Sequence, residues 1–214
     1  MSEVPHLESD GVWCRLREPA PAAGRPALFL DRDGVVVEEA HFLHRPEDVR
    51  LVPGAAAALA LARRRGLALI LATNQSGIAR GLFGWAEFAA TQARVEEMLA
   101  AEGAAGFDMV LACPFHPDGR APYRGEHPCR KPQPGMLLRA AERLGLDLSR
   151  SWALGDRARD LAAGRAAGCA GGLLVSTGYG GAAREAALRI ATPAFEVRLA
   201  KSIADAPSLP IFAP

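Results

Sequence analysis

Ala27-Leu28-Phe29-Leu30-Asp31-Arg32-Asp33-Gly34 is the stretch that decides the fold. Four apolar residues lead directly into two aspartates, and a glycine follows them. A short apolar run between turn-forming residues is typical of a buried strand in a parallel sheet. Ligands of open α/β sheets bind beyond the carboxyl ends of the strands, so this stretch predicts a functional site at residues 31 and 33. The alternative interpretation is a loop that happens to be acidic.

The two aspartates of this stretch need a compensating charge. If the chain stays extended, Asp31 and Asp33 point to the same side, because side chains alternate with period two along a strand. Two carboxylates 4 Å apart repel each other by roughly 4 kcal/mol at an effective dielectric constant near 20. The sequence therefore predicts a cation or a proton at this pair.

Length and composition bound the class of protein. The chain has 214 residues, half of them apolar, which is enough for one α/β domain with a good core. A formal net charge of +1 gives no indication of nucleic-acid or membrane-surface binding. The longest apolar runs, such as 67–72, are too short to cross a bilayer, and no apolar leader opens the sequence. The four cysteines do not form a disulfide framework, so we predict a soluble cytoplasmic protein. The expected oligomeric state is a monomer or a small homo-oligomer, and the sequence does not decide between them.

Strand-like and helix-like segments alternate along the chain. The further strands are expected at 67–72, 107–113, 151–155, 172–175 and 195–199, and the helices at 55–65, 85–102, 136–144 and 158–167. This alternation predicts an α/β fold, a doubly wound (Rossmann-like) parallel sheet with helices on both faces. We expect a single domain over 27–214 and an N-terminal extension, 1–26, packed on it with a short edge strand at 12–16. Residues 35–46 are expected to cross the mouth of the site as a loop or to form an edge hairpin.

Polar side chains also stand at the ends of later strands. Thr73 follows one strand, Asp156 follows another with Asp160 one helical turn further on, and Lys131 lies in a loop before a helix. Each of these residues has a structural interpretation by itself, as a helix cap or a surface charge. With Asp31 and Asp33 they would place four carboxylates, a hydroxyl and one or two cations at one site. Mg²⁺ is typically held by one or two carboxylates plus substrate phosphate, so the set suits phosphoryl transfer.

The expected chemistry gives the two aspartates different roles. An aspartate can form an aspartyl-phosphate intermediate, so Asp31 is the expected nucleophile. Asp33 would protonate the leaving oxygen and later deprotonate the attacking water. Thr73 and Lys131 would face the phosphate oxygens. A different class of protein, a phospho-accepting receiver-like signalling module, also gathers aspartates, a Thr and a Lys on a doubly wound sheet, but such modules are much shorter than this chain.

Four segments of the chain resemble the motifs of the haloacid-dehalogenase (HAD) superfamily. They are Phe29–Gly34, Thr73–Gly81, Cys129–Pro132 and Leu154–Asp160. More narrowly, they are similar to the branch that contains D-glycero-D-manno-heptose 1,7-bisphosphate 7-phosphatases and histidinol phosphatases. The resemblance covers roughly residues 27 to 180. It implies a Mg²⁺-dependent phosphomonoesterase with a minimal cap domain or none, acting on a small phosphorylated sugar, with histidinol phosphate as the alternative substrate.

The resemblance also implies roles for individual residues. Asp31 is the nucleophile, Asp33 the acid/base, and Thr73 and Lys131 the phosphate contacts. Magnesium would be held by Asp31, Asp156 and the backbone carbonyl of Asp33, with Asp160 behind them. The residues expected to contact the substrate are Arg32, Glu39, His41, Phe42, Asn74, Gln75, Ser76 and Arg130. Val37 stands where the branch usually has a polar residue, which leaves the preferred substrate open.

An irregular insert near 113–129 separates the third strand from the lysine motif. It is too long and too rich in proline for an ordinary connection, so we expect it to be functional or tied by metal. The branch commonly carries a zinc loop here, but Phe115 stands at one of the ligand positions and cannot bind metal. With the next residue in its place, Cys113, His116, His127 and Cys129 would form a tetrahedral zinc site. The alternative is a metal-free loop held by its prolines and by packing.

Overall fold

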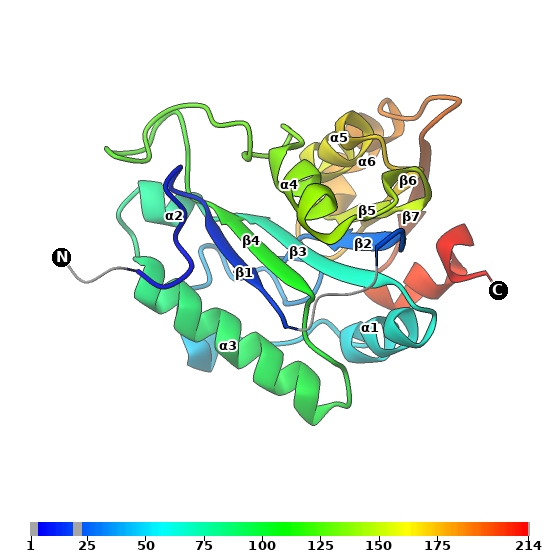
Figure 1. The fold of residues 1–214 in the computed structure, drawn as a ribbon, viewed down its shortest axis with the longest axis horizontal. Coiled ribbons are helices and arrows are strands. Elements are labelled where there is room, and N and C mark those ends of the chain that lie inside the picture. The colour runs from blue at the N-terminus through cyan, green and yellow to red at the C-terminus, as the bar shows by residue number, and fades with distance from the viewer. Residues whose placement is uncertain (1–3, 19–22, 214) are drawn as a thin grey trace.

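The fold is an open seven-stranded sheet with helices on both faces (Figure 1). The computed structural model describes residues 4–18 and 23–213. The spatial order of the strands is β1-β4-β3-β2-β5-β6-β7, and every neighbouring pair is parallel except β1 with β4. The strands are β1 (Trp13–Leu16), β2 (Ala27–Leu30), β3 (Ala68–Asn74), β4 (Met109–Cys113), β5 (Trp152–Gly155), β6 (Gly171–Val175) and β7 (Glu196–Ala200).

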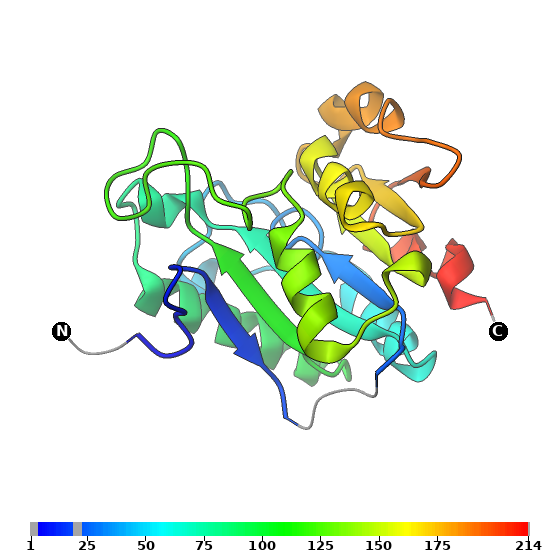
Figure 2. The same cartoon turned by 45° about the horizontal axis from the view of Figure 1, so that its top comes forward.

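Helices α1 and α3 cover one face of the sheet, and α4, α5 and α6 cover the other (Figures 1 and 2). The alternation of side chains along β2 explains both layers: Leu28 and Leu30 join the core on one face, and Ala27 and Phe29 join the core on the other. The α-helices are α1 (Ala55–Arg64), α2 (Ser76–Ala79), α3 (Trp85–Ala101), α4 (Gly135–Leu144), α5 (Ala158–Ala167) and α6 (Gly180–Leu188). Short 3₁₀ turns cover Pro46–Asp48, Leu148–Arg150, Ile203–Ser208 and Pro210–Phe212.

The strand that begins with Ala27 lies at the centre of the sheet. From β2 the chain moves outward through β3 to β4, then crosses back to β5 on the other side of β2 and continues to β6 and β7. The strand order therefore reverses between β2 and β5. In doubly wound sheets the ligand crevice opens at the carboxyl ends of the strands at this reversal, which here is where Asp31 and Asp156 follow their strands.

Most of the predicted elements are confirmed, and the differences lie at the carboxyl edge of the sheet. β3 runs two residues further than expected, through Thr73 to Asn74. Helices α2 and α6 were not predicted. Residues 35–45 cross the mouth of the site as a loop, held by an isolated bridge between Val37 and Leu51 and not by paired hairpin strands. Three consecutive valines, 35–37, are fully buried and anchor this loop.

The predicted edge strand of the N-terminal extension is present as β1. It pairs antiparallel with β4, and the segment before it is tied to α4 by ion pairs from Glu8 to Arg139 (2.7 Å) and Arg143 (2.5 Å). Residues 1–3 and 19–22 of the predicted extension lie outside the described residues. The part that is described is thus an integral edge of the sheet as well as an arm laid over it.

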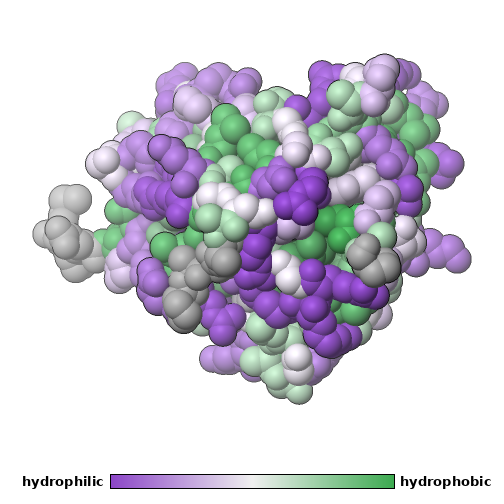
Figure 3. All heavy atoms as spheres, turned by 45° about the vertical axis from the view of Figure 1, so that its right-hand side comes forward, coloured by the Kyte–Doolittle hydropathy of each residue, from purple (hydrophilic) through white to green (hydrophobic). Residues whose placement is uncertain are grey.

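The surface mixes polar and apolar side chains. Figure 3 shows one face on which hydrophilic residues are widespread, with apolar residues between them. None of the helices in the described part of the chain has the length and apolar character needed to cross a membrane. Among the described residues, the exposed large hydrophobic ones are Leu82, Leu138, Tyr179 and Leu188. Tyr179 is the member of this group that lines the site.

Candidate active site

A buried lysine and two aspartates form the base of the site. Lys131 Nζ lies 3.1 Å from Asp31 Oδ1 and 2.7 Å from Asp160 Oδ1. Burial by itself would lower the pKa of Lys131, but the charges of Asp160 and Asp31 raise it. Burial would likewise raise the pKa of Asp31, but Lys131 and then Arg159 hold it below its ordinary value. Asp31 is therefore ionised at neutral pH.

Asp156 adds a third carboxylate to this base. Asp31, Asp156 and Asp160 each place one carboxylate oxygen within 4.8 Å of the others. Asp156 is 1% exposed and accepts a hydrogen bond from the backbone N–H of Tyr179 at 2.8 Å. Burial raises the pKa of Asp156 to about 7 against the effect of that hydrogen bond, and the charges of Asp31 and Asp160 add to the rise. Three buried carboxylates thus lie together, and the lysine pairs with two of them, Asp31 and Asp160.

A hard divalent cation fits this set of oxygens. Asp160 is already occupied, because Oδ1 pairs with Lys131 and Oδ2 accepts the backbone N–H of Arg157 at 3.0 Å. Asp31 Oδ1 pairs with Lys131 and accepts the N–H of Arg32, which leaves Oδ2 available. One oxygen of Asp31 and one of Asp156 therefore remain without a partner. Two carboxylate oxygens suit Mg²⁺, which is usually held by one or two carboxylates together with water and substrate phosphate.

Two glycines make room for the Asp156 carboxylate. Gly34 and Gly178 both adopt positive φ, +79° and +65°, which side-chain-bearing residues rarely do. A Cβ at Gly34 would lie 2.7 Å from Asp156 Oδ2, and a Cβ at Gly178 only 2.4 Å from it. The backbone after Asp33 therefore runs directly against Asp156.

The carboxylate of Asp33 stands apart from the three-carboxylate group. It lies 3.1 Å from Arg32 Nη2 and accepts a hydrogen bond from Gln75 Nε2 at 3.1 Å. Arg32 is fully buried, donates to the carbonyl of Leu43 at 3.0 Å and faces the ring of Phe88. Arg32, expected to contact substrate, is not among the residues that line the cavity. Arg32 lies beneath the cavity and holds Asp33 instead.

The end of β3 holds the lysine in place. Asn74 Nδ2 donates to the carbonyl of Lys131 at 3.0 Å, and the Lys131 N–H donates to Asn74 Oδ1 at 3.1 Å. Thr73 Oγ1 accepts a hydrogen bond from Gln75 Nε2 at 2.9 Å. The two residues that follow Thr73 therefore position both expected phosphate contacts: Asn74 holds the backbone of Lys131, and Gln75 holds the hydroxyl of Thr73.

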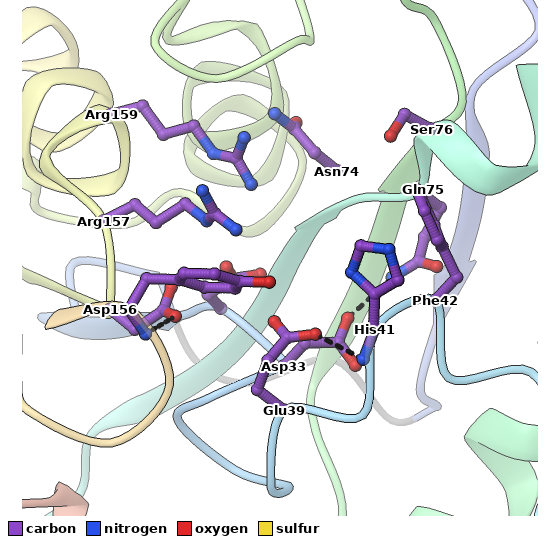
Figure 4. A pocket seen from close by; sticks show the side chains of 12 residues that line it. Asp33, Glu39, His41, Phe42, Asn74, Gln75, Ser76, Asp156, Arg157 and Arg159 are labelled. Atoms are coloured by element: carbon purple, nitrogen blue, oxygen red, sulfur yellow. Dashed lines mark hydrogen bonds between the residues drawn. The ribbon is translucent and has the colours of Figure 1, made fainter.

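A cavity of about 150 Å³ opens above these residues (Figure 4). The Glu39 loop forms one wall, where Glu39 accepts the backbone N–H of His41 at 2.8 Å and both His41 and Phe42 take positive φ. Arg157 and Arg159 form the wall on the α5 side and point toward Asn74. The lining residues are Asp31, Asp33, Glu39, His41, Phe42, Asn74, Gln75, Ser76, Asp156, Arg157, Arg159 and Tyr179.

Sequence reasoning missed three residues of this lining, and two expected substrate contacts, Arg32 and Arg130, do not line it. Arg157 and Arg159 stand between the two aspartates of the fourth motif, and that proximity could have indicated them. Tyr179 carried no signal in the sequence. Arg130, expected to contact substrate, does not line the cavity, because its Nη1 donates to the carbonyl of Phe115 at 2.8 Å. Burial lowers the pKa of Arg130, and the nearby charge of Arg159 lowers it further.

The four predicted zinc ligands are not brought together. Within residues 4–18 and 23–213, the only cluster of potential metal ligands is the aspartate group described above, so Cys113 and Cys129 form no such cluster with the two histidines. His116 Nε2 lies 3.1 Å from Nη2 of Arg80, and His127 stacks on Phe115 with ring centroids 4.3 Å apart. The phenylalanine that replaces a ligand in the motif thus packs against one of the expected ligands, and aromatic packing holds this part of the loop.

Comparisons with known proteins agree with the site. Residues 128–206 match a family model described as HAD-hydrolase-like. The D-glycero-beta-D-manno-heptose-1,7-bisphosphate 7-phosphatase of Mesorhizobium japonicum is 47% identical over 175 residues, which cover 80% of each chain. The Escherichia coli protein of the same name is 38% identical over 154 residues, or 72% of this chain and 80% of that one.

A solved structure supports the same assignment. The D,D-heptose 1,7-bisphosphate phosphatase of B. bronchiseptica, complexed with magnesium and phosphate, superposes with a TM-score of 0.73 at 35% identity. The match covers 86% of this chain and 96% of that one. The chain belongs to the D-glycero-D-manno-heptose-1,7-bisphosphate 7-phosphatase family of HAD-like phosphatases.

Proposed function

We propose that this enzyme hydrolyses the 7-phosphate of a heptose 1,7-bisphosphate through an aspartyl-phosphate intermediate. The observation that carries the proposal is the buried Asp31 carboxylate, kept ionised by Lys131 at the base of a polar cavity. The names of the relatives supply the substrate, and the small cavity with both acidic and basic walls is compatible with a phosphorylated sugar.

The chemistry follows from the different surroundings of the two aspartates. An oxygen of Asp31 attacks phosphorus, and the bond from phosphorus to the sugar oxygen breaks. Asp33, held toward the cavity by Arg32 and Gln75, gives its proton to the leaving oxygen. Asp33 then takes a proton from a water molecule that attacks the aspartyl phosphate, which releases inorganic phosphate and restores Asp31.

The remaining residues of the site position the phosphoryl group and balance its negative charge. Lys131 and Thr73 bind the non-bridging phosphoryl oxygens, and Asn74 fixes the backbone of Lys131 beside Asp31. Asp31, Asp156 and the backbone carbonyl of Asp33 would hold Mg²⁺, with Asp160 behind them. When bound, the ion neutralises charge on the phosphoryl group.

The walls of the cavity bind the sugar. Glu39 and His41 offer hydrogen-bond partners for hydroxyl groups, and Ser76 faces them from the start of α2 (Figure 4). The cytoplasmic location and the monomeric or small homo-oligomeric state stay predictions.

A substrate comparison tests the proposal. We expect Mg²⁺-dependent phosphate release with a kcat/KM for heptose 1,7-bisphosphate at least about tenfold above that for histidinol phosphate. Histidinol phosphate carries an ammonium group, which the cations of Arg157 and Arg159 would repel. Asp31→Asn should abolish turnover of both substrates. A preference for histidinol phosphate would overturn the substrate, and normal turnover by Asp31→Asn would overturn the chemistry. Stable self-phosphorylation without hydrolysis would favour a receiver-like module.

A further inference from the structure

Arg32 is a charged side chain enclosed in the core beneath the cavity. It is fully buried, and its guanidinium carbon lies 5.4 Å from the centroid of the Phe88 ring. Its Nη1 is buried and has no hydrogen-bond partner among residues 4–18 and 23–213. Taking a guanidinium out of water is unfavourable, and a well-packed apolar residue often gives the same stability at such a position. The stability of the core therefore does not explain why an arginine stands here.

The guanidinium of Arg32 holds the carboxylate of Asp33 from beneath. Nε lies 3.2 Å from Oδ1 and 3.3 Å from Oδ2 of Asp33, and Nη2 lies 3.1 Å from Oδ1. Gln75, which directly follows β3, donates from Nε2 to Oδ2 at 3.1 Å. The side chain of Asp33 is 20% exposed and lines the cavity, whereas that of Arg32 is not exposed. A planar guanidinium fixes the orientation of a carboxylate, which the single charge of a lysine does not.

The same guanidinium also holds the loop at the mouth of the cavity. Nη2 of Arg32 donates a hydrogen bond to the backbone carbonyl of Leu43 at 3.0 Å. The two preceding residues, His41 and Phe42, line the cavity and take positive φ angles of 47° and 67°. Residues with side chains keep such a conformation only where the surrounding structure fixes it. The bond to Leu43 therefore anchors the end of the segment that faces the substrate.

We propose that Arg32 is a positioning residue that holds the acid/base Asp33 and the loop Glu39–Phe42 in one fixed arrangement. The loop places the sugar, and Asp33 meets the leaving oxygen of that sugar, so both have to keep the same position relative to the phosphorus atom. Arg32 acts through these two groups without contacting the substrate. The inference rests on the proposed function and adds a residue on which its proton-transfer step depends.

The two contacts predict two separable effects in Arg32→Lys, which keeps the charge but cannot hold the carboxylate and the carbonyl in the same way. Loss of the fork on Asp33 should lower the maximal rate of hydrolysis by about 10- to 100-fold. Loss of the bond to the Leu43 carbonyl should raise the half-saturating substrate concentration by about 3- to 10-fold. Only the first effect should depend on the carboxylate of Asp33.

The test is a double-mutant cycle of Arg32→Lys with Asp33→Asn. Single turnovers of heptose 1,7-bisphosphate with Mg²⁺ and enzyme in excess give both values, even for slow variants. In the Asp33→Asn background, Arg32→Lys should change the maximal rate by less than about threefold, because residues that act as a unit are not additive. The rise in the half-saturating concentration should persist. Arg32→Gln should give the same pattern with larger effects, and Arg32→Lys decides the matter if Arg32→Gln does not fold.

Arg63→Lys is the matched control, because it alters another arginine–aspartate pair far from the cavity. Arg63 Nη1 lies 2.6 Å and 2.7 Å from the two oxygens of Asp108, and Nη2 donates to the carbonyl of Gly106 at 2.9 Å. Asp108 directly precedes β4, so this pair lies at the amino edge of the sheet, opposite the site. Arg63→Lys should lower the melting temperature and leave both kinetic values unchanged.

Three results would overturn the inference while the proposed function stands. One is the same loss of rate from Arg32→Lys in both backgrounds, which indicates general damage to the fold. Another is a wild-type rate in Arg32→Lys, and the third is an unchanged half-saturating concentration. Normal turnover by Asp33→Asn, or no turnover of heptose 1,7-bisphosphate by the wild type, would instead overturn the proposed function.

Discussion

At the scale of single residues, Asp156 determines how the site responds to pH. Its ordinary pKa is 3.8, and burial with neighbouring charges raises the value in the folded protein to about 7. Without metal, the folded state therefore binds a proton that the unfolded chain has lost. The stability contributed by this proton is fully present below pH 3.8 and is lost as the pH rises through about 7.

Magnesium has to replace this proton on Asp156, so we expect the affinity of the protein for Mg²⁺ to rise with pH. Below the pKa of Asp156 the affinity should drop about tenfold for each pH unit. Melting temperatures with EDTA and with Mg²⁺, measured between about pH 5 and pH 8, check this. Asp156→Asn should remove both the magnesium effect and its pH dependence. Stabilisation by magnesium that is the same at every pH would contradict the assignment.

A second residue-scale prediction concerns the glycine next to Asp156. Gly178→Ala places a methyl group where the Asp156 carboxylate lies, because the added Cβ would be 2.4 Å from Oδ2. We expect kcat to fall by about 10- to 100-fold through displacement of this carboxylate. Gly66→Ala is the matched control: Gly66 has a similar φ of +78° but no neighbour within 4 Å.

Both substitutions introduce a side chain at positive φ, so both should lower the free energy of unfolding by about 1 kcal/mol or more. Only Gly178→Ala should lose activity and magnesium affinity, as measured by steady-state kinetics and by titration of the ion. Equal activity of the two variants would show that Asp156 is not held by Gly178.

At the scale of elements, the sequence predicted the strands and helices that carry the motifs. Five strands with uninterrupted apolar runs, β2 to β6, and four helices bounded by glycines or prolines lie where the periodicity placed them. Helix α2 is a single turn of four residues, too short to show a period. Helix α6 begins with two glycines, which favour a turn over a helix, so its start gave no signal.

At the scale of elements, the four residues of the possible zinc site are not brought together in the described part of the chain, for a related reason. The spacing of the cysteines and histidines in the sequence does not predict how the residues between them pack. Phe115 lies edge-on to Tyr123, and Tyr123 accepts a hydrogen bond from Trp85 Nε1 at 2.9 Å. These contacts, with the stack on His127, give the loop an aromatic core of its own. A motif with one altered ligand position therefore does not predict how the loop is held.

The N-terminal arm gives a prediction at the same scale. Arg139 of α4 pairs with both Glu8 and Asp10, in a partly buried network that joins the arm to α4. Arg139→Ala should lower the free energy of unfolding by about 1 kcal/mol and the melting temperature by about 2–4 °C. Arg189→Ala, which breaks the pair between Arg189 and Glu185, is the control. Both side chains of this pair are more than three-quarters exposed, so Arg189→Ala should lower the free energy of unfolding much less. A similar fall in both variants would contradict a structural role for the arm.

At the scale of the whole molecule, the site exists because the strand order reverses between β2 and β5. This topology brings Asp31 and Asp156, 125 positions apart, to neighbouring strand ends. The base of the site could be predicted, because each acidic or basic residue directly follows a strand or stands in a short motif. The walls could not, because Tyr179 faces Arg157 only after α5 and β6 have folded onto the sheet. The burial of Arg32 was equally hidden, since a charged residue between two aspartates suggests exposure.

The central claim is that Asp31 attacks phosphorus and carries the phosphoryl group. Its most direct test is to mix the Asp33→Asn variant with ³²P-labelled substrate and Mg²⁺, quench with acid, and map the labelled peptide by mass spectrometry. The amide introduced at position 33 slows both the protonation of the leaving oxygen and the deprotonation of the attacking water, so little phosphoenzyme turns over, and the label that the acid quench traps should be on Asp31. A label on any other residue, or release of phosphate by the wild type while Asp31 is never phosphorylated in either protein, would contradict the account.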